Sequence, residues 1–151
     1  MLAWLVGRIV KRAYQQANAG DIDALTKAFA REVVFEFHGD TRLGGERRGP
    51  DGVREWFRQV AEELGRLELT AQDVVASGPP WNMRVIVRIS DRAHLISGHE
   101  FENYGFQFLR LRWGKIVEDR ILVDLDIVRR ELAAVERAAH GMSPINSPSA
   151  E

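Results

Sequence analysis

The sequence predicts an α+β protein in which helices come first and a sheet follows. Apolar residues recur at helical spacing in the first 30 residues and again between residues 50 and 65. After residue 66, four successive segments alternate between apolar and polar residues, as strands do. The short connections between these segments are typical of an antiparallel meander.

The helices are bounded by recognisable capping residues. The first is expected from residue 2 to Asn18, with Gly20 as its C-terminal cap, and Asp21 caps a second. The third runs from Pro50 to Gly65 and has the most regular apolar face of the sequence. That face consists of Val53, Trp56, Phe57, Val60, Ala61 and Leu64.

The strands and the last helix fill the rest of one domain, residues 1–140. Residues 33–38 alternate as a strand, and a polar loop over 39–49 follows it. Further strands are expected over the segments 67–77, 82–90, 101–113 and 115–127, before a helix over roughly 127–140. The expected order is therefore α-α-β-α-β-β-β-β-α, and the Ser- and Pro-rich residues 141–151 are expected to form a flexible tail.

Composition excludes several classes of function. The 151 residues suit a single domain, and a net charge of −1 argues against nucleic acid as a partner. Without cysteine there are no disulfides, thiolate nucleophiles or zinc–sulfur sites, and the four histidines lack metal-ligand spacing, so no metal is expected. No apolar run is long enough to span a membrane, and the N-terminus lacks signal-peptide features. We therefore expect a soluble, cytoplasmic protein.

Several short motifs occur in an order that resembles a known superfamily. They are Asn18-Ala19-Gly20-Asp21, Ala28-Phe29-Ala30, Leu43-Gly44-Gly45, Arg48-Gly49-Pro50-Asp51-Gly52-Val53, Phe108-Leu109-Arg110-Leu111 and Gly114-Lys115-Ile116-Val117. Over roughly residues 5–135 the chain resembles the nuclear-transport-factor-2-like superfamily, in its SnoaL-like branch. The resemblance implies a cone-shaped, bent sheet around an apolar pocket, with dimerisation through the outer face of the sheet. Its members include ketosteroid isomerases, polyketide cyclases, epoxide hydrolases and proteins that bind without catalysis.

One carboxylate interrupts an apolar strand face. In 117–127 the odd-numbered positions are apolar except Asp119. A carboxyl group on such a face is desolvated, which raises its pKa and suits it to acid or base catalysis near neutral pH. The alternatives are that a bulge turns Asp119 outward or that an arginine pairs with it.

Two amides lie on the odd-numbered face of 101–113. Asn103 and Gln107 have apolar neighbours there and need hydrogen-bond partners. The resemblance to ketosteroid isomerases aligns Gln107 with an acid that stabilises an oxyanion, and an amide N–H can do the same. Alternatively, Gln107 satisfies a group of the sheet or of a helix end. The even-numbered face carries Tyr104, Phe106 and Phe108, which suit a dimer interface.

The remaining candidates surround these residues. Tyr14 lies near the apolar face of the first helix, where its hydroxyl either reaches the pocket or makes one core hydrogen bond. The expected substrate-binding residues are Phe35, Phe37, Trp56, Val85, Val87, Asn103, Leu109 and Ile121.

The residues that define the catalytic relatives are missing. Phe37 stands where the resemblance to ketosteroid isomerases would have the general-base aspartate. Phe35 and Phe37 replace the tyrosine and asparagine of the epoxide hydrolases, and Ile121 replaces their last-strand aspartate. Their arginine aligns with Arg88, but its aspartate partner aligns with Ser90.

Three hypotheses therefore stay open. The first is a cofactor-free enzyme that acts on a small apolar carbonyl, enol or epoxide compound, with Asp119, Gln107 and Tyr14 as catalytic residues. The second is a non-catalytic protein of the same fold that binds a small apolar molecule. The third is a dimeric interaction module whose pocket is filled by its own side chains.

Overall fold

A computed structural model describes residues 2–95 and 98–141. Its helices and strands follow the order α1 (Leu2–Asn18), α2 (Ile22–Thr26), β1 (Phe29–Phe37), β2 (Gly45–Arg48), α3 (Gly49–Leu64), β3 (Arg66–Ser77), β4 (Met83–His94), β5 (Glu100–Arg112), β6 (Lys115–Val123) and α4 (Leu125–Ala139). The predicted α+β class is confirmed. Apart from Gly141, the tail expected over 141–151 lies outside the described residues.

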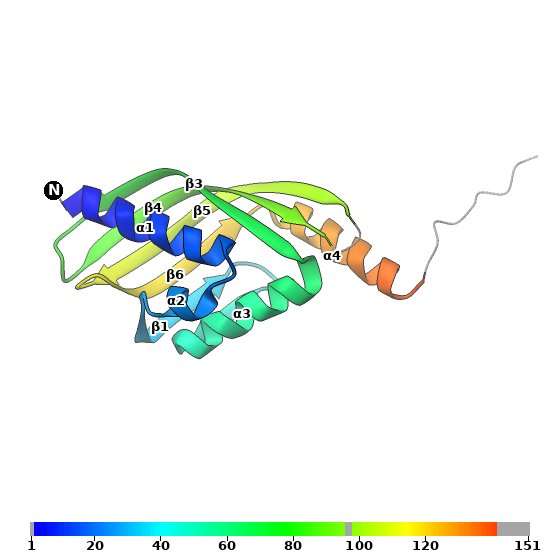
Figure 1. Cartoon of the computed structure of the whole chain (residues 1–151), viewed down its shortest axis with the longest axis horizontal. Coiled ribbons are helices and arrows are strands. Elements are labelled where there is room, and N and C mark those ends of the chain that lie inside the picture. The colour runs from blue at the N-terminus through cyan, green and yellow to red at the C-terminus, as the bar shows by residue number, and fades with distance from the viewer. Residues whose placement is uncertain (1, 96–97, 142–151) are drawn as a thin grey trace, which may run out of the picture.

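A curled, mixed sheet of six strands forms the body of the molecule (Figure 1). The strand order is β2-β1-β6-β5-β4-β3, and β3 to β6 pair antiparallel in the expected meander. Strand β1 pairs parallel with β6, which places the first strand of the chain beside the last. Helices α1, α2 and α3 lie on one side of the sheet, while α4 extends from one end (Figure 1).

Several boundaries differ from the sequence-based expectations, including the end of β4 at His94 rather than residue 90 and the end of β6 at Val123 rather than residue 127. The polar loop over 39–49 contains strand β2, which pairs with β1 although its residues are mostly charged. Strand β1 begins at Phe29 rather than residue 33, because Phe29 already pairs with Ile116 of β6. Helix α4 begins at Leu125 rather than residue 127, since the Asp124 side chain accepts hydrogen bonds from the first turn.

The core lies between the helices and the concave face of the sheet. Helix α1 buries Val6 and Val10, and α3 buries Val53, Trp56, Val60 and Leu64. Helix α1 packs on β3 and α3 packs on β1, so the two helices cover opposite ends of the strand order on the same face of the sheet. The inner faces of β5 and β6, in the middle of the sheet, therefore look into the space between the helices.

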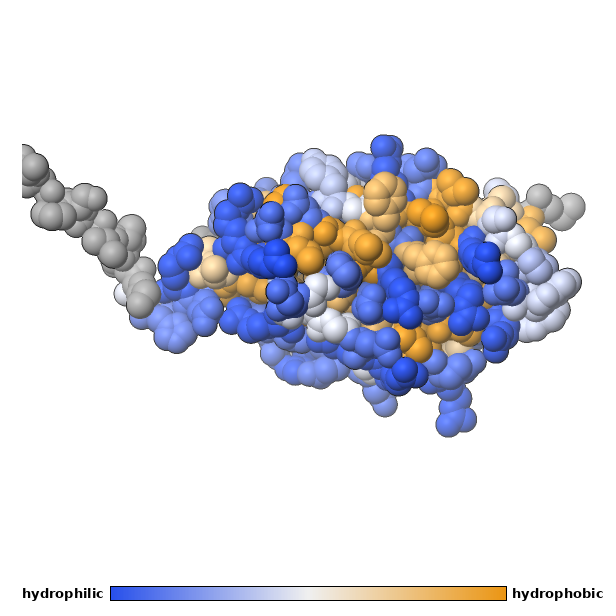
Figure 2. Space-filling model, turned by 180° about the vertical axis from the view of Figure 1, so that it is seen from behind, coloured by the Kyte–Doolittle hydropathy of each residue, from blue (hydrophilic) through white to orange (hydrophobic). Residues whose placement is uncertain are grey.

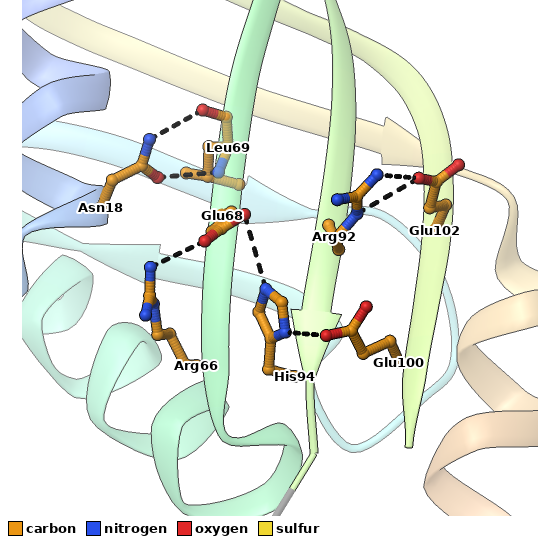
Figure 3. A network of polar contacts seen from close by, with 8 residues as sticks. All are labelled: Asn18, Arg66, Glu68, Leu69, Arg92, His94, Glu100 and Glu102. Atoms are coloured by element: carbon orange, nitrogen blue, oxygen red, sulfur yellow. Dashed lines mark hydrogen bonds and ion pairs between the residues drawn. The ribbon is translucent and has the colours of Figure 1, made fainter. Parts of the chain in front are cut away.

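A side-chain clamp fixes the end of α1 to the edge strand β3. The Asn18 Nδ2 donates to the Leu69 carbonyl at 2.9 Å, and the Leu69 N–H donates to Asn18 Oδ1 at 2.7 Å (Figure 3). Close by, His94 on β4 lies between Glu68 of β3 and Glu100 of β5 (Figure 3). These contacts join the ends of neighbouring strands and give α1 a fixed position above the sheet.

None of the described helices is both long enough and apolar enough to cross a membrane.

Candidate functional site

An apolar cavity of about 90 Å³ lies between the helices and the sheet. This volume is smaller than the roughly 150 Å³ cavity that binds benzene in an engineered protein. The cavity therefore suits a ligand of at most about one ring.

A chain of three side chains crosses this cavity. The Tyr14 hydroxyl of α1 donates to Gln107 Oε1 at 2.6 Å, and Gln107 Nε2 donates to Asp119 Oδ1 at 2.8 Å. Gln107 lies opposite Ile121 in the β5–β6 pair, and Asp119 lies opposite Leu109. Gln107 and Asp119 are thus diagonal neighbours on one face, a spacing that a glutamine side chain can span.

Burial controls the ionisation of this chain. Asp119 is 2% exposed, and burial raises its pKa to about 7, while the hydrogen bond from Gln107 lowers it. Burial is also the main cause of a raised pKa at Tyr14, and the negative charges of Asp119 and Asp91 raise it further. The Tyr14 hydroxyl therefore keeps its proton. Among the described residues, Gln107 donates a hydrogen bond to Asp119 Oδ1, and no side chain or backbone group donates to Asp119 Oδ2.

Asp91 is a second carboxyl group in the cavity, and the sequence analysis missed it. It continues the inward-facing series Met83, Val85, Val87 and Ile89 of β4. Its Oδ1 is buried without a hydrogen-bond partner in the described part of the chain, and burial raises its pKa to about 7. The period of two would have found Asp91, but the expected strand ended at residue 90.

Asn103 lines the cavity but has structural partners. Its Oδ1 accepts from the N–H groups of Tyr104 at 2.8 Å and Asp124 at 3.2 Å. Its Nδ2 donates to the Asp124 carbonyl at 3.2 Å. These bonds tie β5 to the residue that caps α4, so the Asn103 amide serves mainly the sheet and the helix end.

The other expected wall residues divide into two groups. Phe35, Phe37, Trp56, Leu109 and Ile121 line the cavity, together with the three residues of the hydrogen-bonded chain. Val85 and Val87 do not line it, which corrects the sequence-based assignment. Both side chains are fully buried in the same core cluster, where neighbouring side chains fill the space around them.

An aromatic group forms one wall. The Trp56 ring lies 5.1 Å from the Phe35 ring and 5.4 Å from the Phe37 ring, measured between centroids. The Trp56 Nε1–H donates to the Leu43 carbonyl at 3.0 Å, which satisfies its only polar atom and fixes the ring. These phenylalanines occupy the first-strand positions where catalytic relatives were expected to carry polar residues.

The charges of the cavity have one sign. The described residues that line it include Asp91 and Asp119 but no lysine, arginine or histidine. Across residues 2–95 and 98–141, no group of three or more histidine, aspartate or glutamate side chains could hold a metal ion. The site offers acid, base and hydrogen-bonding groups in an apolar enclosure.

Comparisons with known proteins agree with this architecture. A family model described as the SnoaL-like domain matches residues 10–119, so the chain belongs to the SnoaL-like domain family. The resemblance inferred from the sequence motifs is therefore confirmed. None of the curated proteins compared matches the chain.

Solved structures share the fold at low sequence identity. An NTF2-like protein of unknown function from Burkholderia pseudomallei superposes with a TM-score of 0.74 at 20% identity, over 83% of this chain and 95% of that one. A hypothetical protein with a ketosteroid isomerase-like fold from Catenulispora acidiphila, in complex with trimethylamine, has a TM-score of 0.71 at 17% identity, over 83% of this chain and 92% of that one. A Mycobacterium tuberculosis protein in complex with estradiol-17β-hemisuccinate has a TM-score of 0.68 at 20% identity, over 78% and 92%.

Proposed function

We propose that the chain is a cofactor-free enzyme that uses acid–base chemistry on a small, largely apolar substrate. The observation that carries this proposal is the buried Asp119 carboxyl, held by Gln107 at 2.8 Å inside an apolar cavity. Such a group is costly to bury, and a carboxyl that titrates near neutral pH is well matched to proton transfer. Structural relatives that hold small molecules, such as trimethylamine and estradiol-17β-hemisuccinate, support a small-molecule site.

Asp119, Gln107 and Tyr14 each have a different role in the proposed reaction. Asp119 Oδ2 removes a proton from the carbon next to a substrate carbonyl, and the C–H electron pair passes into an enolate. Gln107 orients the carboxylate through its Nε2–H. Tyr14 stabilises the enolate oxygen by donating its hydroxyl proton in a hydrogen bond. The enolate then takes the proton back at another carbon or attacks an electrophile, which gives isomerisation or cyclisation. With an epoxide, Asp119 instead takes a proton from water, whose oxygen attacks an epoxide carbon as the C–O bond of that carbon breaks. The released alkoxide accepts a hydrogen bond from Tyr14 and takes the proton back from Asp119.

Gln107 links the two ends of the chain. While Asp119 is ionised, the Tyr14 hydroxyl donates its hydrogen bond to Gln107 Oε1 and is not available to the substrate. Once Asp119 Oδ2 has taken a proton, the carboxyl group and the Gln107 amide can each turn by 180°. The Asp119 O–H then donates to Oε1, and Nε2 donates to the Tyr14 oxygen. The Tyr14 hydroxyl proton becomes free for the substrate oxygen when that oxygen gains negative charge.

Proton exchange tests the proposal without knowledge of the natural substrate. One-ring ketones incubated with the protein in D₂O should exchange their α-hydrogens, as followed by NMR. We expect Asp119→Asn to slow this exchange by about 10²- to 10⁴-fold. The control, Asp73→Asn, changes an exposed aspartate of β3 and should leave the rate unchanged. Exchange that persists in Asp119→Asn would refute the role of Asp119.

A non-catalytic binding protein is the second candidate. Phe35 and Phe37 on β1 and Ile121 on β6 are apolar where catalytic relatives are expected to be polar, and all three line the cavity. Under this alternative, one-ring ligands bind to the wild-type protein but none of the ketones or epoxides in the panel reacts. Binding and exchange measured on the same compounds separate the two functions.

We also propose that two copies associate through the outer face of the sheet. Tyr104 and Phe106 of β5 are more than half exposed there, and Ile86 and Leu122 lie on the neighbouring strands β4 and β6. Figure 2 shows this side of the molecule, where apolar side chains gather among charged ones. Sedimentation velocity at about 50 µM tests it, a concentration suited to moderate affinities; a single monomer boundary would contradict it. The cytoplasmic location expected from the sequence stays a prediction.

A further inference from the structure

The proposed chemistry leaves one carboxyl group of the cavity unused. Asp91 lies opposite Leu69 of β3 and opposite Asn103 of β5. Its Oδ1 is buried and accepts no hydrogen bond from any described residue. Two polar side chains near Asp91 already have hydrogen-bond partners. Asn103, opposite Asp91 in the sheet, bonds to backbone groups, and Tyr14 of α1 donates to Gln107.

A buried oxygen without a partner is unfavourable unless something else supplies a donor. The described residues around the cavity offer no lysine, arginine or histidine to neutralise a carboxylate. The donor for Asp91 Oδ1 is therefore either a water molecule or a ligand that enters the cavity. The cavity selects against anions, because a ligand carboxylate would meet two carboxyl groups of the same sign.

We propose that the natural ligand is a one-ring amine, bound as its cation with the ammonium group on Asp91 and its apolar ring against the aromatic wall. An ammonium both donates hydrogen bonds and neutralises the carboxylate, whereas a hydroxyl only donates. The volume of about 90 Å³ sets the size of the ring system. This inference rests on the proposed function for the site but concerns a different residue.

Binding of three compounds with the same ring tests the proposal. Cyclohexylamine, cyclohexanol and cyclohexanecarboxylate are titrated into the wild-type protein and Asp91→Asn at pH 7.5, followed by NMR. We expect the amine to bind the wild type at least about 10-fold more tightly than the alcohol, and the carboxylate least tightly. Asp91→Asn should weaken amine binding about 10- to 100-fold and change alcohol binding less than about threefold.

The Asp119→Asn variant identifies which carboxyl group holds the amine. It should keep the preference for amine over alcohol, because Asp91 remains. The proposal is overturned if the wild type binds the alcohol as well as the amine, if none of the three compounds binds, or if the preference is lost in Asp119→Asn rather than in Asp91→Asn. If a variant fails to fold, the wild-type ranking still tests whether the cavity prefers an amine to an alcohol.

The pH dependence adds a second readout. Burial raises the pKa of Asp91 to about 7, so amine affinity should rise from pH 5.5 to 8 as this carboxyl ionises. The other titratable groups facing the cavity are Tyr14 on α1 and Asp119 on β6; the lining residues of the remaining described elements do not titrate. Because Asp119 titrates in the same range, the measurement is made in Asp119→Asn. An amine affinity that is flat with pH there would contradict the proposal.

The amine proposal and the enzymatic proposal fail separately. Absence of α-hydrogen exchange in every ketone removes the catalytic role of Asp119 and leaves the binding experiment unaffected. Conversely, a protein that exchanges α-hydrogens but prefers cyclohexanol to cyclohexylamine keeps its proposed chemistry and loses only the assignment of the ligand to Asp91.

Discussion

The two carboxyl groups of the cavity differ in their nearest partner. Asp119 accepts a hydrogen bond from Gln107, which favours the charged form, whereas Asp91 Oδ1 has no such partner among the described residues. Burial raises both pKa values, and at Asp119 the amide opposes that effect. Gln107 therefore lowers the pKa of Asp119 against the effect of burial, which matters for the proposed role of Asp119 as a base.

Replacing Gln107 with leucine should raise the pKa of Asp119 above its value of about 7, because the hydrogen bond that favours the carboxylate is lost. A ¹³C-detected NMR titration of the Asp119 carboxyl measures the change directly. Exchange at pH 7 should slow, since a smaller fraction of Asp119 is ionised, and recover in part at higher pH. Gln15→Leu, on the exposed side of α1, should leave the titration unchanged. A lower pKa in Gln107→Leu would contradict this account.

At the level of single residues, the sequence predicted what strand alternation encodes. Asp119 and Gln107 were found because each interrupts an apolar face of a regular strand. Asp91 was missed because the expected strand ended at residue 90, whereas β4 continues to His94. Val85 and Val87 were misassigned because alternation identifies an inward-facing side chain without showing whether the space beside it is filled or empty.

At the level of elements, the close pairing of β5 and β6 positions Gln107 and Asp119, the proposed catalytic pair. Gly105 lies midway between Asn103 and Gln107 on β5, and a Cβ atom at Gly105 would lie 1.9 Å from the Leu122 carbonyl oxygen of β6. Since this neighbour is backbone, it cannot move aside without displacing the strand. The absence of a side chain at Gly105 thus allows the approach that places Gln107 within reach of Asp119.

Gly105→Ala should therefore destabilise the fold by about 2 kcal/mol or more and lower α-hydrogen exchange. Gly7→Ala in α1 is the matched control, because nothing lies within 4 Å of a Cβ atom built at Gly7. In a helix interior that change should be neutral or stabilising by up to about 1 kcal/mol. Chemical denaturation of both variants gives the comparison, and equal stabilities would show that β5 and β6 can separate at no cost.

Element types were more predictable than element boundaries. The helical spacing of α3 and the alternation of β3 to β6 identified these elements correctly. Strand β2 escaped prediction because its sequence, Gly45–Arg48, is glycine followed by charged residues, and its pairing with β1 is decided by tertiary contact. The parallel pairing of β1 with β6 likewise depends on where the first strand is placed by the helices.

At the scale of the whole molecule, function and stability compete in the cavity. An apolar space enclosed by two helices and a curled sheet would be most stable with apolar side chains throughout. The fold instead buries two carboxyl groups there, each with a pKa raised to about 7. Ionising either one inside the folded protein is unfavourable compared with ionising it in the unfolded chain.

The contribution of these two carboxyls to stability should therefore fall as pH rises from about 4 to above 7. Below about pH 3 both are largely protonated in the folded and unfolded chains alike. As pH rises, the unfolded chain loses these protons first, so the raised pKa values in the folded state reduce the free energy of unfolding. The loss is of the order of 4 kcal/mol for each group once pH exceeds the folded pKa. The test is urea denaturation of a double variant that carries both Asp91→Asn and Asp119→Asn, at pH 4, 6 and 8. Because this variant lacks both carboxyl groups, its free energy of unfolding relative to the wild type should increase at each step in pH. Asp73→Asn should follow the wild-type curve, and parallel curves for all three proteins would mean that neither carboxyl is desolvated as the structure requires.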